Sequence, residues 1–134
     1  IYYINTLMKN IILKYLYYLS LIFLILVYLV PGNLFGYFLY GDLSIQPNLF
    51  SDPNGRSYDH FIYFTFLSII GFLTYFEYNS IKRVFRFLIS ISFMLEVLHL
   101  IIPNRTFEFS DIIANILGVL FGYTIIMIYK KKYE

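Results

Sequence analysis

Two short segments of this chain place ionisable or amide side chains at the end of one long apolar run and at the start of the next. Glu96 and His99 stand three residues apart near the end of one apolar run, so they share a helix face. Asp111 and Asn115 stand four residues apart at the start of the next run and share a face in the same way. An ionisable group at membrane depth is costly and usually faces a helix bundle or a cavity. These four residues are therefore candidates for binding a ligand or transferring a proton.

Two more residues extend the candidate set. Arg105 lies in the short connection 103–110 between these two runs, where a guanidinium group could meet an anionic ligand or a carboxylate. His60 lies at the start of an earlier apolar run. Either His60 or Glu96 could act as a general base, with Arg105 stabilising the negative charge that develops.

Each candidate also has a purely structural interpretation. Asp111 could be a helix N-cap, and His60 could be an ordinary solvated residue at a helix end. Glu96 and His99 could form only a structural salt bridge or a hydrogen bond between helices. An N-cap would not explain Asn115, which lies within its apolar run.

The spacing of these residues does not predict a metal site. Two histidines, a glutamate and an aspartate can ligate metals, but no H-E-x-x-H or equivalent pattern occurs. The chain has no cysteine, which excludes disulfides and thiolate sites. It also lacks a glycine-rich phosphate loop, a G-x-S-x-G elbow and a basic nucleic-acid face. We therefore expect no metal, no cofactor and no nucleic-acid partner.

The helix that begins at Asp111 carries small residues further along. Ala114, Gly118 and Gly122 follow at steps of four, and Gly118-x-x-x-Gly122 permits close approach of another helix. They could form the wall of a groove, but packing against a neighbouring helix is the simpler interpretation.

The composition indicates which elements position these residues. Of 134 residues, 60% are hydrophobic and 13% charged, whereas soluble domains are about half apolar and a quarter charged. Four windows are each long enough to cross a membrane, at about 11–30, 58–76, 84–102 and 111–129. We predict one all-α domain, residues 11–129, made of four transmembrane helices.

The basic residues indicate the orientation of this bundle. Eight of the ten flank one side of the predicted spans: Lys9, Lys14, Lys82, Arg83, Arg86, Lys130, Lys131 and Lys132. The positive-inside rule then places both termini in the cytoplasm, as an N-terminal segment 1–10 and a basic tail 130–134. Met8 could be a natural start, although a cleaved signal peptide is an alternative. The loops 31–57 and 103–110 face outward, and the apolar part of the first could lie on the membrane or dip into it.

This orientation brings three separate segments to the outer half of the membrane with their polar residues. We predict a polar pocket at the outer face. Its residues are His60, Glu96, His99, Arg105, Asp111 and Asn115.

The stretch "EVLHLIIPNRTFEFSDIIANILGVLFG" resembles the signature of the VanZ-like family of small bacterial membrane proteins. That family shows Glu-x-x-Gln before Pro-x-Arg, and then a helix with Asp-x-x-x-Asn-x-x-Gly-x-x-x-Gly. The matching residues here are Glu96, Pro103, Arg105, Asp111, Asn115, Gly118 and Gly122, with His60 and Phe61 matching an upstream His-Phe. His99 replaces the family's glutamine, and Asp59 directly precedes His60 where the family usually reads Asp-Lys-x-x-His.

The resemblance implies a multi-pass protein of the bacterial cytoplasmic membrane. The founding member is linked to low-level resistance to the glycopeptide teicoplanin. We expect the pocket to bind or modify a lipid-linked or cell-envelope ligand, with membrane lipids as partners. An intramembrane enzyme that uses Glu96 or His60 as general base is an alternative. A purely structural accessory subunit is another.

Overall fold

A computed structural model describes the backbone of residues 2–45 and 55–133, and the side chains of residues 10–45, 58–77 and 79–132. Within these ranges the chain is helical and has no strand, which confirms the all-α prediction. The helices are α1 Tyr2–Leu29, α2 Leu34–Tyr40, α3 Gly55–Thr74, α4 Tyr78–Leu98 and α5 Phe109–Tyr133.

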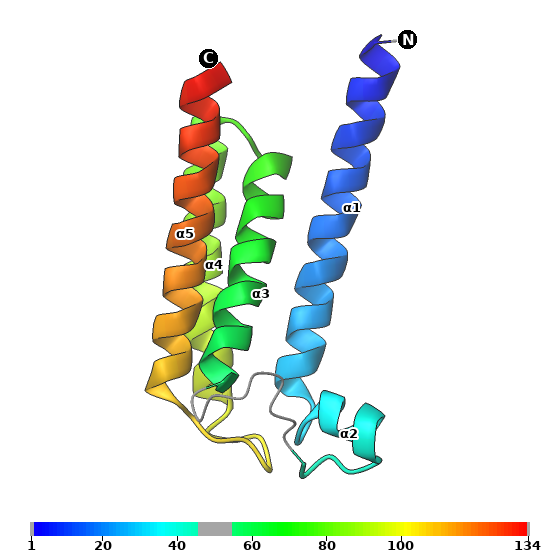
Figure 1. Cartoon of the computed structure of the whole chain (residues 1–134), viewed down its shortest axis with the longest axis vertical. Coiled ribbons are helices and arrows are strands. Elements are labelled where there is room, and N and C mark those ends of the chain that lie inside the picture. Colours follow the sequence, from blue (N-terminus) through cyan, green and yellow to red (C-terminus); the bar gives the residue numbers. More distant parts are fainter. Residues whose placement is uncertain (1, 46–54, 134) are drawn as a thin grey trace.

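Helices α3, α4 and α5 pack side by side, and α1 contacts this group mainly through α3 (Figure 1). The α3–α5 pair forms the most extensive contact between helices. Both termini lie at one end of the bundle together with the turn between α3 and α4. Helix α2 and the connection between α4 and α5 lie at the opposite end, which we call the α2 end.

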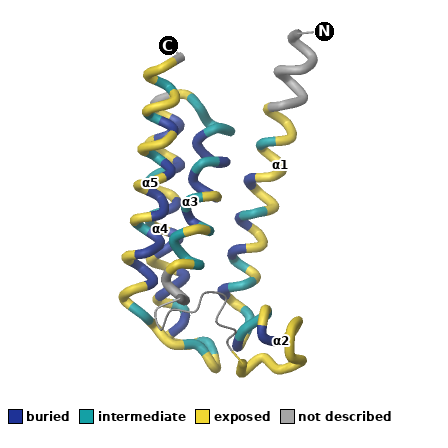
Figure 2. Tube along the Cα trace, viewed as in Figure 1, coloured by how far each residue is buried: buried dark blue, intermediate teal, exposed yellow. Residues whose placement is uncertain are grey.

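Two helices are long and apolar enough to cross a membrane. They contain the segments Asn10–Leu29 and Phe109–Lys132, of which only 17% and 39% are buried in the protein. A core helix of a soluble protein would be mostly buried, and Figure 2 shows exposed residues along both helices. We interpret the chain as a membrane protein on this basis. The apolar segment Tyr58–Thr74 of α3 is shorter, and α4 begins with a basic turn, so four spans remain a prediction.

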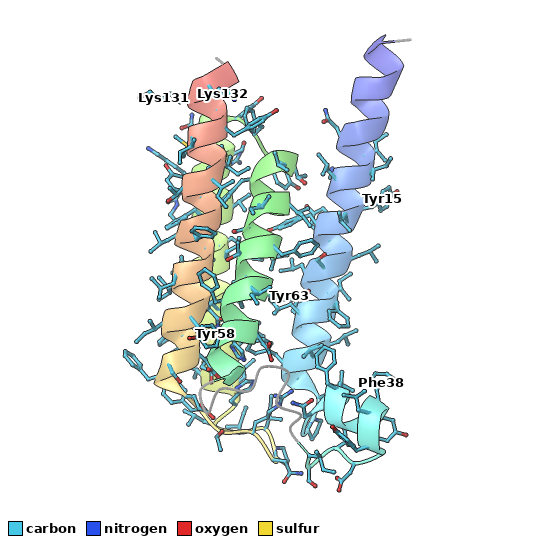
Figure 3. All side chains as sticks on the ribbon, viewed as in Figure 1. Tyr15, Phe38, Tyr58, Tyr63, Lys131 and Lys132 are labelled. Carbon is cyan, nitrogen blue, oxygen red and sulfur yellow. The ribbon has the colours of Figure 1, made fainter. Side chains whose placement is uncertain are left out.

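Charge divides between the two ends of the bundle. Lys82, Arg83 and Arg86 occupy the first turns of α4, and Lys130 to Lys132 occupy the last turn of α5, where Figure 3 labels Lys131 and Lys132. These segments lie at the end that holds both termini (Figure 1). Arg105 lies at the α2 end. The predicted orientation rests on this unequal distribution of basic residues between the two ends.

The core is formed by apolar side chains of α1, α3, α4 and α5. Phe64, Leu67, Leu88 and Val119 are fully buried. Gly118 and Gly122 place α5 directly against α3: a Cβ on Gly118 would lie 2.5 Å from the Phe61 carbonyl oxygen. A Cβ on Gly122 would overlap the hydroxyl of Ser68. Such small residues allow two helices to approach closely.

Helix α4 ends earlier than the predicted span. The prediction extended it to about residue 102, but the helix ends at Leu98. From His99 onward the backbone forms tighter i to i−3 bonds, such as His99 N–H to Glu96 O at 3.1 Å and Leu100 N–H to Val97 O at 3.1 Å. His99 therefore begins the connection to α5 instead of lying inside α4.

A short helix occupies the first part of the predicted outer loop. Asn33 Oδ1 accepts a hydrogen bond from the Gly36 N–H at 3.0 Å and caps α2, and Gly41 ends the helix with a φ of 73°. The helix is mostly exposed, and Phe38 projects away from the bundle (Figure 3). The rest of that loop, 46–54, lies outside the described residues.

Candidate functional site

Glu96 is fully buried near the α2 end of α4. His99 Nδ1 lies 3.2 Å from Glu96 Oε1, and because a carboxylate only accepts, the imidazole is the donor. The backbone N–H of Glu108 donates to the same oxygen at 3.0 Å. These two bonds fix the carboxylate against the chain just before α5. The other oxygen, Oε2, is buried and has no hydrogen-bond partner among the described residues.

Tyr28, at the α2 end of α1, joins the candidate residues of three other segments. Its hydroxyl lies 2.8 Å from His60 Nδ1 and accepts a hydrogen bond from Asn115 Nδ2 at 3.3 Å. Its ring stacks on the His99 ring, with centroids 5.1 Å apart and planes 17° from parallel. No motif or spacing singles out Tyr28 among the fifteen tyrosines of the chain. Only its position in space identifies it as part of the site.

Asp111 and His60 meet between the first turns of α5 and α3. Asp111 Oδ2 lies 3.6 Å from His60 Nε2, and the Asp111 side chain is 8% exposed. Asp111 lies inside the first turn of α5, which begins at Phe109. Its carboxylate is therefore turned toward the neighbouring helix α3, at a helix end where negative charge is favoured.

Arg105 binds backbone carbonyl groups, whereas the sequence predicted that its guanidinium would meet an anionic ligand or a carboxylate. Its Nη2 donates to the Val27 carbonyl oxygen at 2.6 Å, and its Nε donates to that of Val30 at 3.4 Å. These carbonyls belong to the end of α1, where the last C=O groups have no partner within the helix. Burial lowers the pKa of the Arg105 guanidinium, while Tyr28 and Glu96 oppose this effect. Arg105 thus ties the α4–α5 connection to α1.

A cavity of about 740 Å³ lies beside these residues, between α1 and α3. Its polar lining residues gather toward the α2 end, where Leu34 and Phe35 of α2 also line it, and its lining toward the middle of the bundle is apolar or aromatic. The polar lining includes Asn33, Asp59, His60, His99, Arg105, Thr106, Glu108 and Asp111. The apolar lining includes Phe23, Leu24, Val27, Ile62, Tyr63 and Phe66, and Figure 3 places Tyr63 on the face of α3 toward α1.

The structure brings the six predicted residues to the α2 end, but in two layers. His60, His99, Arg105 and Asp111 line the cavity. Glu96 and Asn115 are fully buried behind this lining. Glu96 is bonded to His99 and to the backbone of Glu108, and Asn115 is bonded to Tyr28. Like Glu96 Oε2, two further buried atoms, His99 Nε2 and Asn115 Oδ1, have no hydrogen-bond partner among the described residues. Buried polar groups left in this way are rare in proteins and call for an explanation.

Comparisons with known proteins support the resemblance noted from the sequence. Comparison with curated proteins and with solved structures gave no match. The model of the VanZ/LLP1 family matches residues 2–130. The match therefore extends beyond the residues that carry the resemblance, His60 to Gly122, and includes α1, which contributes Tyr28 to the site. The chain belongs to the VanZ/LLP1 family.

Proposed function

We propose that this protein binds an amphipathic, lipid-linked ligand of the cell envelope in the cavity between α1 and α3. The observation that carries the proposal is the division of this cavity into a polar and an apolar end. Its lining on α3 runs from Asp59 to Phe66, a rise of about 10 Å at 1.5 Å per residue. The polar residues lie toward the α2 end, together with Leu34 and Phe35, whereas the lining toward the middle of the bundle is apolar or aromatic. A ligand with a polar head and an apolar chain has the matching distribution.

The head group would lie at the polar end. His60 and Thr106 can exchange hydrogen bonds with it. Arg105 uses two of its five N–H donors for the α1 carbonyls, so three remain for an anionic or hydroxylated group. The apolar chain would lie against Ile62 and Phe66, which are about half exposed at the side of the bundle. A lipid could enter there from the surrounding membrane.

The proposal includes four membrane spans with both termini in the cytoplasm of a bacterium. The cavity's polar end would then lie at the outer face, because it lies opposite the end that carries both termini and most basic residues. A role in resistance to glycopeptides such as teicoplanin would follow if the ligand belongs to cell-wall synthesis.

One observation favours an enzymatic alternative. His60 lies on the cavity wall with one nitrogen facing Asp111 and the other facing Tyr28, an arrangement that can orient an imidazole for proton transfer. Glu96 is a weaker candidate for general base, because it is fully buried and already accepts two hydrogen bonds. Turnover that is lost in His60→Gln protein that still binds lipid would favour this alternative.

The test is lipid mass spectrometry of the protein purified in mild detergent, comparing two tryptophan variants. Ile62→Trp places an indole in the cavity lining, and Leu117→Trp places one on the outer surface of α5. Both native residues are 51% exposed, so the two changes carry a similar structural cost. We expect Leu117→Trp to retain the lipid found in the native protein and Ile62→Trp to lose it.

Equal retention of lipid by both variants would refute the cavity as the binding site. Native protein without copurified lipid, and without lipid uptake from bacterial total-lipid vesicles, would refute ligand binding altogether. The polar cluster would then be structural, as expected for an accessory subunit.

A further inference from the structure

We propose that His60, Glu96 and Asp111 form a binding site for a divalent transition-metal ion. Each residue offers one ligand atom, and the three atoms lie within 4.8 Å of one another. They come from α3, α4 and α5, at positions 60, 96 and 111. No spacing along a single helix could have predicted this set, which is why a motif such as H-E-x-x-H is absent.

The separation of the donor atoms suits a small metal ion. Ligand bonds of 2.0 to 2.2 Å place two donors of a tetrahedral site about 3.4 Å apart. His60 Nε2 and Asp111 Oδ2 are 3.6 Å apart, close to this spacing. Because all three donor atoms lie within 4.8 Å of one another, no pair has to close by more than about 1.4 Å, which is within reach of a carboxylate side-chain rotation.

Glu96 supplies a second and independent observation. Its Oε1 accepts hydrogen bonds from His99 Nδ1 and from the Glu108 backbone, while the buried Oε2 has no hydrogen-bond partner within the described ranges. Burying an ionised oxygen without a partner is costly. Metal-binding carboxylates are commonly held in this way, with hydrogen bonds that orient the group and leave one oxygen for the metal.

His60 is oriented by a corresponding partner. Its Nδ1 lies 2.8 Å from the Tyr28 hydroxyl, which is itself held by the Asn115 amide. When Nδ1 carries the proton and donates to Tyr28, Nε2 presents its lone pair on the side of Asp111. A hydrogen bond from the second imidazole nitrogen is the usual support of a metal-binding histidine.

The charges at this end of the cavity also favour a cation. Among the described side chains, four acids lie here, namely Asp59, Glu96, Glu108 and Asp111, against one arginine, Arg105, and two histidines. A divalent ion would reduce the repulsion between the two carboxylates that bind it. One imidazole nitrogen with two carboxylate oxygens, and no thiolate, suits Zn²⁺ or Mn²⁺ better than the softer Cu⁺.

Three protein ligands leave at least one coordination position open, as in catalytic zinc sites. His60 and Asp111 line the cavity, so this position faces it. A phosphate oxygen of a lipid head group could fill it, which would explain how an acidic cavity accepts an anionic ligand. This last step rests on the proposed function, whereas metal binding itself does not.

The test is binding of Zn²⁺ and of Mn²⁺ to full-length, tag-free protein that has been stripped with chelator in detergent. Isothermal titration and elemental analysis after gel filtration would measure affinity and stoichiometry. We expect one ion per chain in the native protein. Glu96→Gln and His60→Ala should lose this stoichiometric binding. Tyr28→Phe should weaken it by about 10-fold to 100-fold, the usual effect of losing a hydrogen bond to a metal ligand.

Asp59→Asn is the matched control, because it removes an adjacent acid of the cavity without removing any of the three ligands. It should still bind one ion. Helical circular dichroism and a single gel-filtration peak would establish that each variant is folded. Folded native protein that binds neither ion, or folded His60→Ala and Glu96→Gln that bind like the native protein, would overturn the proposal.

Lipid retention by the stripped protein separates this inference from the proposed function. Lipid binding without metal binding refutes only the metal site, and metal binding without lipid binding refutes only the ligand proposal. If both bind, we expect phosphate-containing lipids to be retained at least about tenfold better with the ion than without it, since an ion contact is stronger than a neutral hydrogen bond.

Discussion

The side-chain amide of Asn115 donates a hydrogen bond to the hydroxyl of Tyr28, 3.3 Å away, although the two residues are 87 positions apart in the chain. Asn115 is fully buried in α5, and Tyr28 lies at the end of α1. The bond therefore links α1 to the centre of the candidate site.

Removing the hydroxyl in Tyr28→Phe should lower the free energy of unfolding by about 1 to 3 kcal/mol, because the Asn115 amide would be left buried without an acceptor. Chemical denaturation in detergent, followed by circular dichroism, measures this. Tyr18→Phe is the control: its hydroxyl pairs with that of Tyr75 at 2.7 Å, but at an exposed position, so we expect a change below about 0.5 kcal/mol. Similar losses in both variants would contradict a special role for Tyr28.

Replacing Arg105 by Gln should release the α4–α5 connection from the end of α1. The expected loss is about 1.5 to 3 kcal/mol, the range for hydrogen bonds that involve a charged group. Breaking a buried ion pair would cost about 3 to 5 kcal/mol instead. Hydrogen exchange should increase in the last turn of α1 around Val27 and Val30, and remain unchanged in the buried part of α3 around Leu67. A loss of 4 kcal/mol or more (about three orders of magnitude in the unfolding equilibrium) would indicate a carboxylate partner.

Gly118→Ala should destabilise the protein although alanine favours helices. On an exposed helix face this change would stabilise by about 1 kcal/mol. Here the added methyl group meets the Phe61 carbonyl oxygen and must push α3 away, for which we expect a loss of about 1 to 3 kcal/mol. Thr124→Ala, exposed on α5, should change stability by less than about 0.5 kcal/mol. A more stable Gly118→Ala protein would show that α3 and α5 do not pack closely here.

The proposed orientation can be tested with single cysteines, because the chain has none of its own. Ser44→Cys lies beyond α2, and Asn79→Cys lies in the first turn of α4; both positions are exposed and lie at opposite ends of the bundle. An impermeant thiol reagent should label Ser44→Cys in intact spheroplasts, and Asn79→Cys only after lysis. Labelling of both in intact cells would rule out four spans, and the reverse pattern would place the cavity at the inner face.

Much of the fold was predictable because apolar runs long enough to cross a membrane are expected to form helices. The predicted windows agree with α1, α3, α4 and α5 to within a few residues at most ends. The clearest departures were the starts of α1 and α4, at Tyr2 and Tyr78 instead of about 11 and 84, and the end of α4. Hydropathy does not change across Leu98 to Ile102, so composition alone could not indicate that the backbone tightens into turns at His99. Composition likewise did not predict the helix α2, because its segment showed only that it is apolar.

By itself, the sequence determined which residues carry charge and on which helix face they stand, because helical periodicity fixes the neighbours at three and four positions. It thereby identified the pair Glu96 and His99 and the pair Asp111 and Asn115. Only the tertiary structure decided which helices face one another. That arrangement puts His60 beside Asp111, uses Tyr28 to join three segments, and directs Arg105 to backbone carbonyls instead of a carboxylate. These contacts depend on the rotation and depth of each helix against its neighbours. Packing at positions such as Gly118 determines both, and no local sequence pattern predicts them.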